Sequence, residues 1–327
     1  MLFLFRTNQI IFNFFLLIYI IVLRSSYFFS PISREVTNDG ILSVFIKNAL
    51  DKNTVAEGAL VIILLFIQAV LLNNLAIKHR LYNETTLLPG LFYVLLMSTL
   101  QDFFPLTAIL LGNLFLIIAL DELMSTYKQS NCAGAIFNAG FWVGLASLCY
   151  SSFSLFFVLL LLGLSLLRSF KVRERLMLMA GFIVPFLFVS AWFFWNNNLL
   201  AYWQTYFFSH FHFLNFQYDQ SGVFLAKLAL LVVFFLLGFF NNYKFDKAIQ
   251  TRNYVNIIYM TLFISGLTFL FQPNVTILHF LIIMVPLSLL VTARFLSFNS
   301  SVAEFIHTLL LITVLFFQYR GFGEIGF

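Results

Sequence analysis

The residues best suited to chemistry are carboxylates in the segments that separate long apolar runs. Asp102 lies in a very tight turn, residues 100–105, between two of these runs. A carboxylate held at a membrane surface can bind a divalent cation or act as a general base. Glu35 and Asp39 lie in an earlier long polar segment and could join it. We therefore name Asp102, Asp39 and Glu35 as candidate catalytic residues. The alternative is that Asp102 is a solvated acid that marks a helix end.

Cationic side chains near the ends of apolar runs are candidates for holding a lipid phosphate. Arg24 and Lys227 occupy such positions, where charge-assisted hydrogen bonds to phosphate are strong; the alternative is that both are anchors that reach the interface. His210 and His212 are two residues apart and would share a face of an extended segment, with Asp219 nearby. They could bind phosphate or a metal ion, or merely decorate an aromatic membrane interface. No spacing among these residues is a metal signature, so the identity of any divalent cation stays open.

The polar residues inside the apolar runs separate the classes of membrane protein. Asp121 and Glu122 close the fourth run, and no charge falls at the centre of any run. Ion-coupled carriers place charges there, so this pattern counts against a carrier without excluding a lipid or sugar flippase. Asn113 lies midway along the fourth run and His279 within the tenth. Hydrogen bonds between helices explain both.

Composition excludes a water-soluble protein. Hydrophobic residues make up 61% of the 327 residues and charged residues 9%, against about 45–50% and about 25% in soluble domains. Cys132 and Cys149 flank one apolar run at opposite ends, so we expect free thiols and not a disulfide. The net charge of +5 arises without a dense basic cluster, so no nucleic acid is expected as a partner. The expected partner is the lipid bilayer.

The apolar runs predict an all-α, polytopic transmembrane helical bundle that forms a single integral membrane domain over residues 1–327. A spanning helix needs about 20 apolar residues, and continuous apolar runs exclude the alternating pattern of a barrel. Ten to twelve helices fit the sequence, because the break at residues 150–152 is weak, and eleven is the central expectation. The runs are 10–29, 58–77, 86–100, 104–123, 134–150, 153–168, 176–195, 222–241, 254–271, 275–293 and 302–319.

The distribution of Lys and Arg predicts a cytoplasmic N-terminus. The two long segments, 30–57 and 196–221, then lie outside, and we expect interfacial or re-entrant helices in both. Long loops on a rigid scaffold tend to carry function, so the chemistry should face outward. This orientation places 12 of the 18 Lys and Arg residues inside, namely Arg6, Lys78, Arg80, Lys128, Arg168, Lys171, Arg173, Arg175, Lys244, Lys247, Arg252 and Arg294.

In the middle of the chain, residues 137–148 read FNAGFWVGLASL and contain a small-xxx-small packing face. This segment resembles the most recognisable part of an uncharacterised family of multi-pass inner-membrane proteins in Bacteroidota. The family then has the string RPFNWREW, where residues 168–175 read RSFKVRER, followed by Gly181 and Pro185. The resemblance covers about residues 80–190. It implies a divergent member located in the bacterial inner membrane, and it carries no known activity.

A weaker and wider resemblance rests on the tight turn before Pro105, the order of the spans that follow, and residues 277–291, ILHFLIIMVPLSLLV. In these features the chain is similar to the GT-C superfamily of polyprenyl-phosphate-sugar glycosyltransferases. It implies a GT-C-like architecture with an outward-facing site, in which Glu35 or Asp39 serves as the first-loop acid and Asp102 as the second. A carboxylate would activate the acceptor while a cation stabilises the departing polyprenyl phosphate. The alternatives are a non-catalytic membrane component of cell-envelope assembly and a flippase for a lipid-linked precursor.

Overall fold

The structure is a computed structural model that describes residues 2–6, 10–29, 40–49, 54–204, 222–239, 248–271 and 276–320. Within these ranges the chain is helical and has no strand. Six helical segments are long and apolar enough to cross a membrane. The predicted fold class, an all-α polytopic bundle, is confirmed, and the chain is a multi-pass membrane protein.

Eleven of the described helices have ten or more residues, and each overlaps one of the eleven predicted apolar runs. The reason is local: each run is long enough to satisfy its backbone within one helix, as a bilayer requires. These helices are α2 (Ile10–Phe29), α4 (Thr54–Lys78), α5 (Leu88–Met97), α6 (Ala108–Ser125), α7 (Ala133–Cys149), α8 (Phe156–Leu167), α9 (Val172–Trp195), α11 (Gly222–Phe239), α12 (Ile249–Leu267), α13 (Phe280–Ser297) and α14 (Ser300–Arg320).

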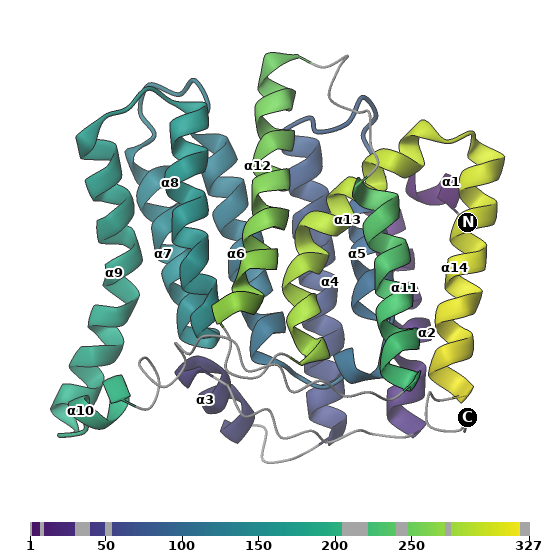
Figure 1. Cartoon of the computed structure of the whole chain (residues 1–327), viewed down its shortest axis with the longest axis horizontal. Coiled ribbons are helices and arrows are strands. Elements are labelled where there is room, and N and C mark those ends of the chain that lie inside the picture. Colours follow the sequence, from purple (N-terminus) through teal and green to yellow (C-terminus); the bar gives the residue numbers. More distant parts are fainter. Residues whose placement is uncertain are drawn as a thin grey trace.

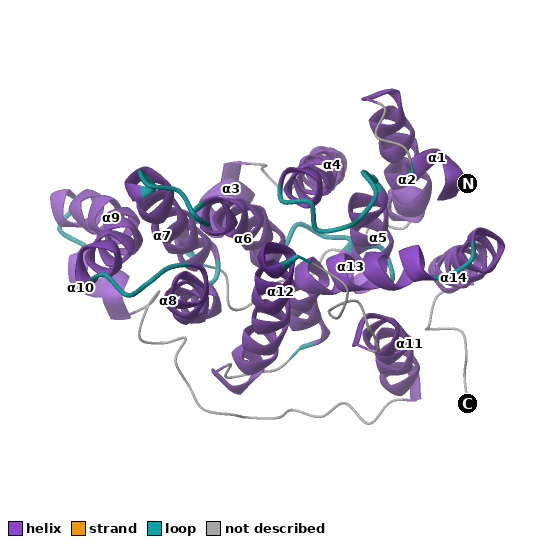
Figure 2. Cartoon of the chain, turned by 90° about the horizontal axis from the view of Figure 1, so that it is seen from above, coloured by secondary structure: helices purple, strands orange, loops and turns teal. Residues whose placement is uncertain are grey.

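Shorter helices lie at the ends of the bundle. α1 (Leu2–Phe5) lies at one end of the bundle. Six short helices lie at the other end, where α2 ends and α6 begins, namely α3 (Ile41–Ala49), η1 (Gln101–Phe103), η2 (Ser151–Leu155), α10 (Leu199–Tyr202), η5 (Thr268–Phe271) and η6 (Ile277–His279). We call the end with η1 the Asp102 face and the end with α1 the Asp121 face (Figure 1). Seen from above, α9 and α10 lie at one side of the bundle and α14 at the other (Figure 2).

The tightest helix pair is α7 with α9, and glycines make it possible. A methyl group added at Gly140 would lie 2.3 Å from the carbonyl oxygen of Leu178, and one added at Gly181 would lie 2.2 Å from that of Phe137. Only glycine allows two backbones to approach so closely. The predicted small-xxx-small packing face is therefore confirmed. Cys132 and Cys149 at the two ends of α7 are buried free thiols, as expected.

The interior of the bundle differs sharply from its edge. In the segment Ile277–Ser297, 72% of an 18-residue apolar stretch is buried inside the protein, whereas in α9 only 17% of such a stretch is buried. The outer side of α9 exposes large apolar side chains such as Phe188, Trp192 and Trp195. In a bilayer such a face contacts lipid tails. The polar groups described next lie at the ends of the buried helices.

Candidate functional site

The turn between α5 and α6, which carries Asp102, is held by a buried arginine from α2. The Nη1 atom of Arg24 donates to the carbonyl oxygens of Phe103 and Phe104, each at 3.0 Å, and its Nη2 atom donates to that of Met97 at 2.8 Å. The guanidinium also lies over the Phe104 ring, 4.7 Å from the ring centroid. Arg24 is only 2% exposed. Its charge therefore fixes the backbone on both sides of Asp102.

Two further helices hold the same turn. On α4, the Glu57 carboxylate accepts a hydrogen bond from the backbone N–H of Leu106 at 2.7 Å. On α14, the Gln318 side chain donates to the carbonyl oxygen of Ser98. Three helices distant in sequence thus position one short turn. Asp102 itself is 8% exposed, so its carboxylate lies at the edge of the packed interior and not out in bulk water.

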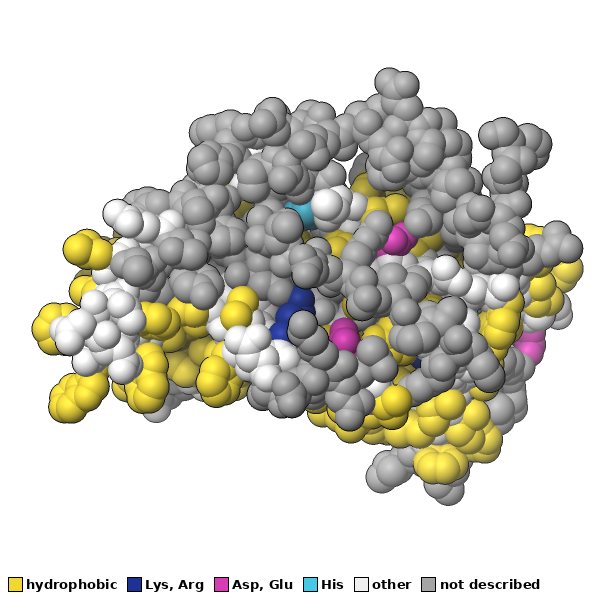
Figure 3. Space-filling model, turned by 90° about the horizontal axis from the view of Figure 1, so that it is seen from below, with side chains coloured by type: hydrophobic (Ala, Val, Ile, Leu, Met, Phe, Trp, Pro, Cys, Tyr) yellow, Lys and Arg dark blue, Asp and Glu magenta, His cyan; other side chains and the backbone are white. Residues whose placement is uncertain are grey.

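A buried imidazole and a phenol lie beside this turn. η1, which carries Asp102, packs against η6, which carries His279. The Nε2 atom of His279 lies 2.6 Å from the hydroxyl oxygen of Tyr150, and both side chains are buried. Figure 3 views the molecule from this side and shows acidic, basic and histidine side chains near the middle of the face. The segment that carries Asp102 therefore packs against the segment that carries the buried His279–Tyr150 pair.

The structure places some of the predicted site residues and leaves others outside its described ranges. Arg24 and Asp102 come together at the same turn. Lys227 lies in α11, and its side chain is not described. Four predicted residues lie outside the described residues, namely Glu35, Asp39, His210 and His212. Within the described ranges, no three His, Cys, Asp or Glu side chains are grouped so as to hold a metal ion.

The sequence analysis singled out neither Glu57 nor Tyr150. Glu57 stands at the start of a span and Tyr150 at a break between two spans, so both read as ordinary boundary residues. The two predicted hydrogen bonds between helices are confirmed. The Asn113 side chain on α6 donates to the carbonyl oxygen of Leu281 on α13 at 2.8 Å, and His279 bonds to Tyr150.

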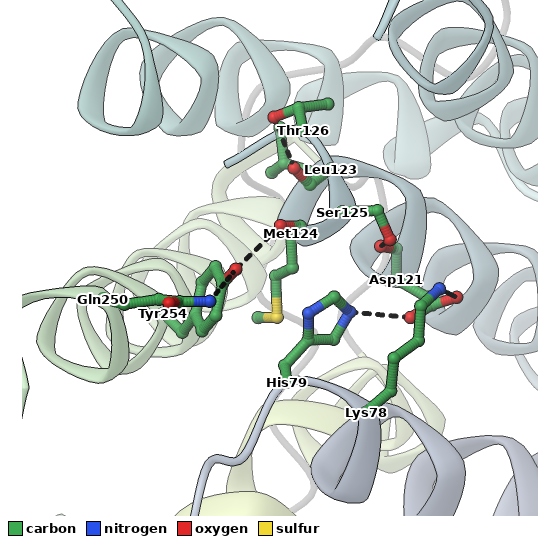
Figure 4. Close-up of polar contacts among 9 residues, drawn as sticks. All are labelled: Lys78, His79, Asp121, Leu123, Met124, Ser125, Thr126, Gln250 and Tyr254. Carbon is green, nitrogen blue, oxygen red and sulfur yellow. Dashed lines mark hydrogen bonds and ion pairs between the residues drawn. The ribbon is translucent and has the colours of Figure 1, made fainter. Parts of the chain in front are cut away.

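A second polar cluster lies at the Asp121 face and joins α4, α6 and α12 (Figure 4). The Asp121 carboxylate accepts from Lys78 Nζ at 2.7 Å and lies 2.7 Å from His79 Nε2. The Lys78 side chain is 54% exposed and that of His79 is 5% exposed. The His79 ring meets the Tyr254 ring edge to face at 5.2 Å, and the Tyr254 hydroxyl donates to the carbonyl oxygen of Met124 at 3.0 Å. Sequence reasoning missed His79, although it follows Lys78 directly at the end of a span.

The motif that carried the family resemblance forms a third polar contact, also at the Asp121 face. Arg168 binds the Glu174 carboxylate through Nη2 at 2.9 Å and Nε at 3.1 Å. Its Nη1 atom donates to the carbonyl oxygens of Thr126 and Gln129. The hydrogen bond to Glu174 raises the pKa of Arg168, so the guanidinium stays charged. Arg168 thus ties the α8–α9 link to the α6–α7 link.

Comparisons with known proteins agree with the resemblance to an uncharacterised family. A family model described as a family of unknown function, DUF6427, matches residues 38–325. No curated protein matches the chain, and no solved structure does. Because the match spans well over half of the sequence, the chain belongs to the DUF6427 family.

Proposed function

We propose that this protein is a transferase of the bacterial inner membrane that acts at the Asp102 face on a polyprenyl-phosphate-linked sugar. The observation that carries the proposal is the turn that holds Asp102, which Arg24, Glu57 and Gln318 fix from three helices. A general base must be held in place to accept a proton in the transition state. A carboxylate on a rigid turn at the membrane edge meets that requirement, and a lipid-linked substrate would reach it from the bilayer.

In the proposed reaction, Asp102 accepts the proton of an acceptor hydroxyl as its oxygen attacks the sugar carbon. The bond between that carbon and the carrier phosphate breaks, and the phosphate leaves with the bonding electrons. A cation must stabilise this leaving group. Because the Arg24 donors already bind protein oxygens, we assign Arg24 to positioning the turn. Lys227 and a divalent cation remain the candidates for the phosphate.

The proposed orientation places the Asp102 face on the periplasmic side and the N-terminus in the cytoplasm. It is supported by the positive charges, because ten of the twelve described Lys and Arg side chains lie at the Asp121 face, whereas Arg24 and Lys47 lie at the Asp102 face. The ten are Arg6, Lys78, Arg80, Lys128, Arg168, Lys171, Arg173, Arg175, Arg252 and Arg294. Cytoplasmic loops carry such an excess. Glu35 and Asp39, in the segment before α3, would lie on the same side as Asp102 and serve as the first-loop acids.

The test is the lipid content of cells that carry altered copies of the chain. In a strain without the gene, the lipid-linked sugar should accumulate, and mass spectrometry of extracted lipids measures it. Asp102→Asn should accumulate the same lipid as the deletion, while Glu84→Gln, which changes an exposed acid at the other face, should restore normal lipids. Equal membrane levels of the variants provide the control for folding. Normal lipids with Asp102→Asn would refute catalysis and leave a non-catalytic component of envelope assembly, or a flippase, as the function to pursue.

A further inference from the structure

The lipid-facing side of α9 carries an apolar stripe that reaches the Asp121 face. Its members are exposed and are spaced by three or four residues, so they share one face of the helix. α9 has the smallest buried share of the six candidate spanning segments and lies at one side of the bundle (Figure 2). In a bilayer, acyl chains therefore contact the stripe. The α9 stripe comprises Val172, Leu176, Met179, Ile183 and Leu187.

Basic side chains lie where the α9 stripe begins. The α8–α9 link and the first turn of α9, residues 168–175, carry four cations and one acid. The acid, Glu174, accepts two hydrogen bonds from Arg168. The Lys171 Nζ atom lies 4.0 Å from Glu174 Oε1, the same oxygen that Arg168 Nη2 contacts at 2.9 Å. One carboxylate therefore serves two cations that lie close together, and this segment keeps an excess of positive charge.

Arg175 connects this basic segment to the α9 stripe. It lies one helical turn after both Lys171 and Val172, so its side chain starts on the side of α9 that carries them. The Arg175 Nη2 atom donates to the Ser165 hydroxyl at 2.8 Å, and the guanidinium lies 5.5 Å from the centroid of the Phe170 ring. These two contacts fix the guanidinium beside the α8–α9 link, at the end of the stripe.

One donor of Arg175 is left without an acceptor. Its Nη1 atom is buried and has no hydrogen-bond partner within the described part of the chain. A buried charged donor without an acceptor costs free energy, so its presence indicates an acceptor that comes from outside the protein. The Phe170 ring beside it is 73% exposed, and little packing prevents the ring from turning aside to admit a ligand. Phosphate oxygens are strong acceptors for both arginine and lysine.

We propose that the start of α9 binds an anionic phospholipid, with the phosphate on Lys171 and Arg175 and an acyl chain along the α9 stripe. A basic segment at the end of a lipid-facing stripe is complementary to a molecule with an anionic head and a hydrocarbon tail. A soluble anion would match the cations but not the stripe. The site is independent of the proposed transferase reaction, because it lies at the opposite end of the bundle from Asp102 (Figure 1).

The test compares two lipids with identical acyl chains on the purified full-length protein in neutral detergent. Native mass spectrometry measures binding of phosphatidylglycerol and phosphatidylcholine, and inorganic phosphate is added in a third arm. We expect preferential binding of phosphatidylglycerol that millimolar inorganic phosphate does not displace. Equal binding of the two lipids would overturn the proposal. Displacement by inorganic phosphate would overturn it as well, because the site would then bind any phosphate and make no use of the α9 stripe.

The variants separate a lipid site from general loss of structure. Lys171→Gln and Arg175→Gln should each lower the preference for phosphatidylglycerol about fivefold, while Arg175→Lys keeps the charge and should keep most of the preference. The Lys171 side chain is 60% exposed, so Lys171→Gln should melt with the parent protein and still lose preference. Arg252→Gln is the matched control, because Arg252 is an exposed arginine at the same end of the bundle but on α12. An unchanged preference with Lys171→Gln, or an equal loss with Arg252→Gln, would contradict the site.

Discussion

The acids at the two ends of the bundle, Asp102 and Asp121, are held in different ways. At the Asp102 face, the buried Arg24 directs its donors to backbone carbonyl oxygens and so holds a turn in shape. At the Asp121 face, the carboxylate of Asp121 pairs with the Lys78 ammonium and lies within hydrogen-bond distance of the His79 ring, both at the end of a neighbouring helix. In the first arrangement a cation fixes the backbone around an acid, and in the second a lysine and a histidine contact the acid itself.

This difference separates a candidate site from a structural contact. An acid that binds two close side chains from a neighbouring helix, as Asp121 does, contributes mainly to holding the helix ends together. Asp102 lies on a turn whose backbone is held by residues from other helices, so its carboxylate has a fixed position from which it could accept a proton. The comparison predicts that substitutions at the two faces should differ in what they change: function at Asp102, and stability at Asp121.

The largest expected loss of stability comes from removing the Arg24 guanidinium. Arg24→Met retains much of the buried volume but leaves the carbonyl oxygens of Met97, Phe103 and Phe104 without their donor. A buried group that loses its partner costs about 1–3 kcal/mol, so we expect a total loss of about 3 kcal/mol in the free energy of unfolding. Thermal melting in detergent measures it. A melting temperature equal to that of the parent protein would show that the turn does not depend on Arg24.

Asp121→Ala should have the next largest effect. It removes the carboxylate 2.7 Å from His79 Nε2, and the His79 side chain, which is 5% exposed, loses that hydrogen-bond partner. We expect a loss of about 2 kcal/mol in the free energy of unfolding, and unchanged lipid-linked sugar in cells that still hold the protein. Asp121→Asn keeps one acceptor oxygen and should lose less. If Asp121→Ala altered the lipid profile while the protein level stayed normal, Asp121 would have a function as well, and the proposed difference between the two faces would be wrong.

Much of the fold could be predicted from sequence because its determinants are local. Eleven apolar runs correspond to eleven helices, and the glycines at 140 and 144 identify a close helix pair. Which side of a helix packs inward is harder to predict, because helices that are apolar all round carry no single stripe that marks the core. The number of long helices and the glycine packing motif could therefore be predicted from the sequence. Which helices are neighbours across the bundle could not.

The candidate site also depends on contacts between distant parts of the chain, which the sequence does not reveal. Asp102 was identified because its tight turn is visible in the sequence, but its supports come from far along the chain. Arg24 is 79 residues from Phe103, and Gln318 is 220 residues from Ser98. His279 was interpreted as a helix-to-helix hydrogen bond, and the structure confirms this, but its place beside the Asp102 turn depends on contact between η1 and η6. Sequence indicates which residues are unusual, and only the packing shows which of them meet.

The smallest expected effect separates the two bases that share Asp121. Lys78 is 54% exposed, so its ion pair at 2.7 Å competes with water and salt. Exposed pairs of this kind contribute about 0.2–1 kcal/mol. We expect Lys78→Met to lower the free energy of unfolding by less than about 0.5 kcal/mol, and the difference from the parent to vanish in high salt because the pair is screened. His79→Ala, by contrast, should destabilise the protein at every salt concentration, since its ring is buried between Asp121 and Tyr254. Melting curves of both variants at low and high salt provide the measurement. A large, salt-independent loss with Lys78→Met would mean that the exposed lysine, and not the buried imidazole, holds the Asp121 cluster together.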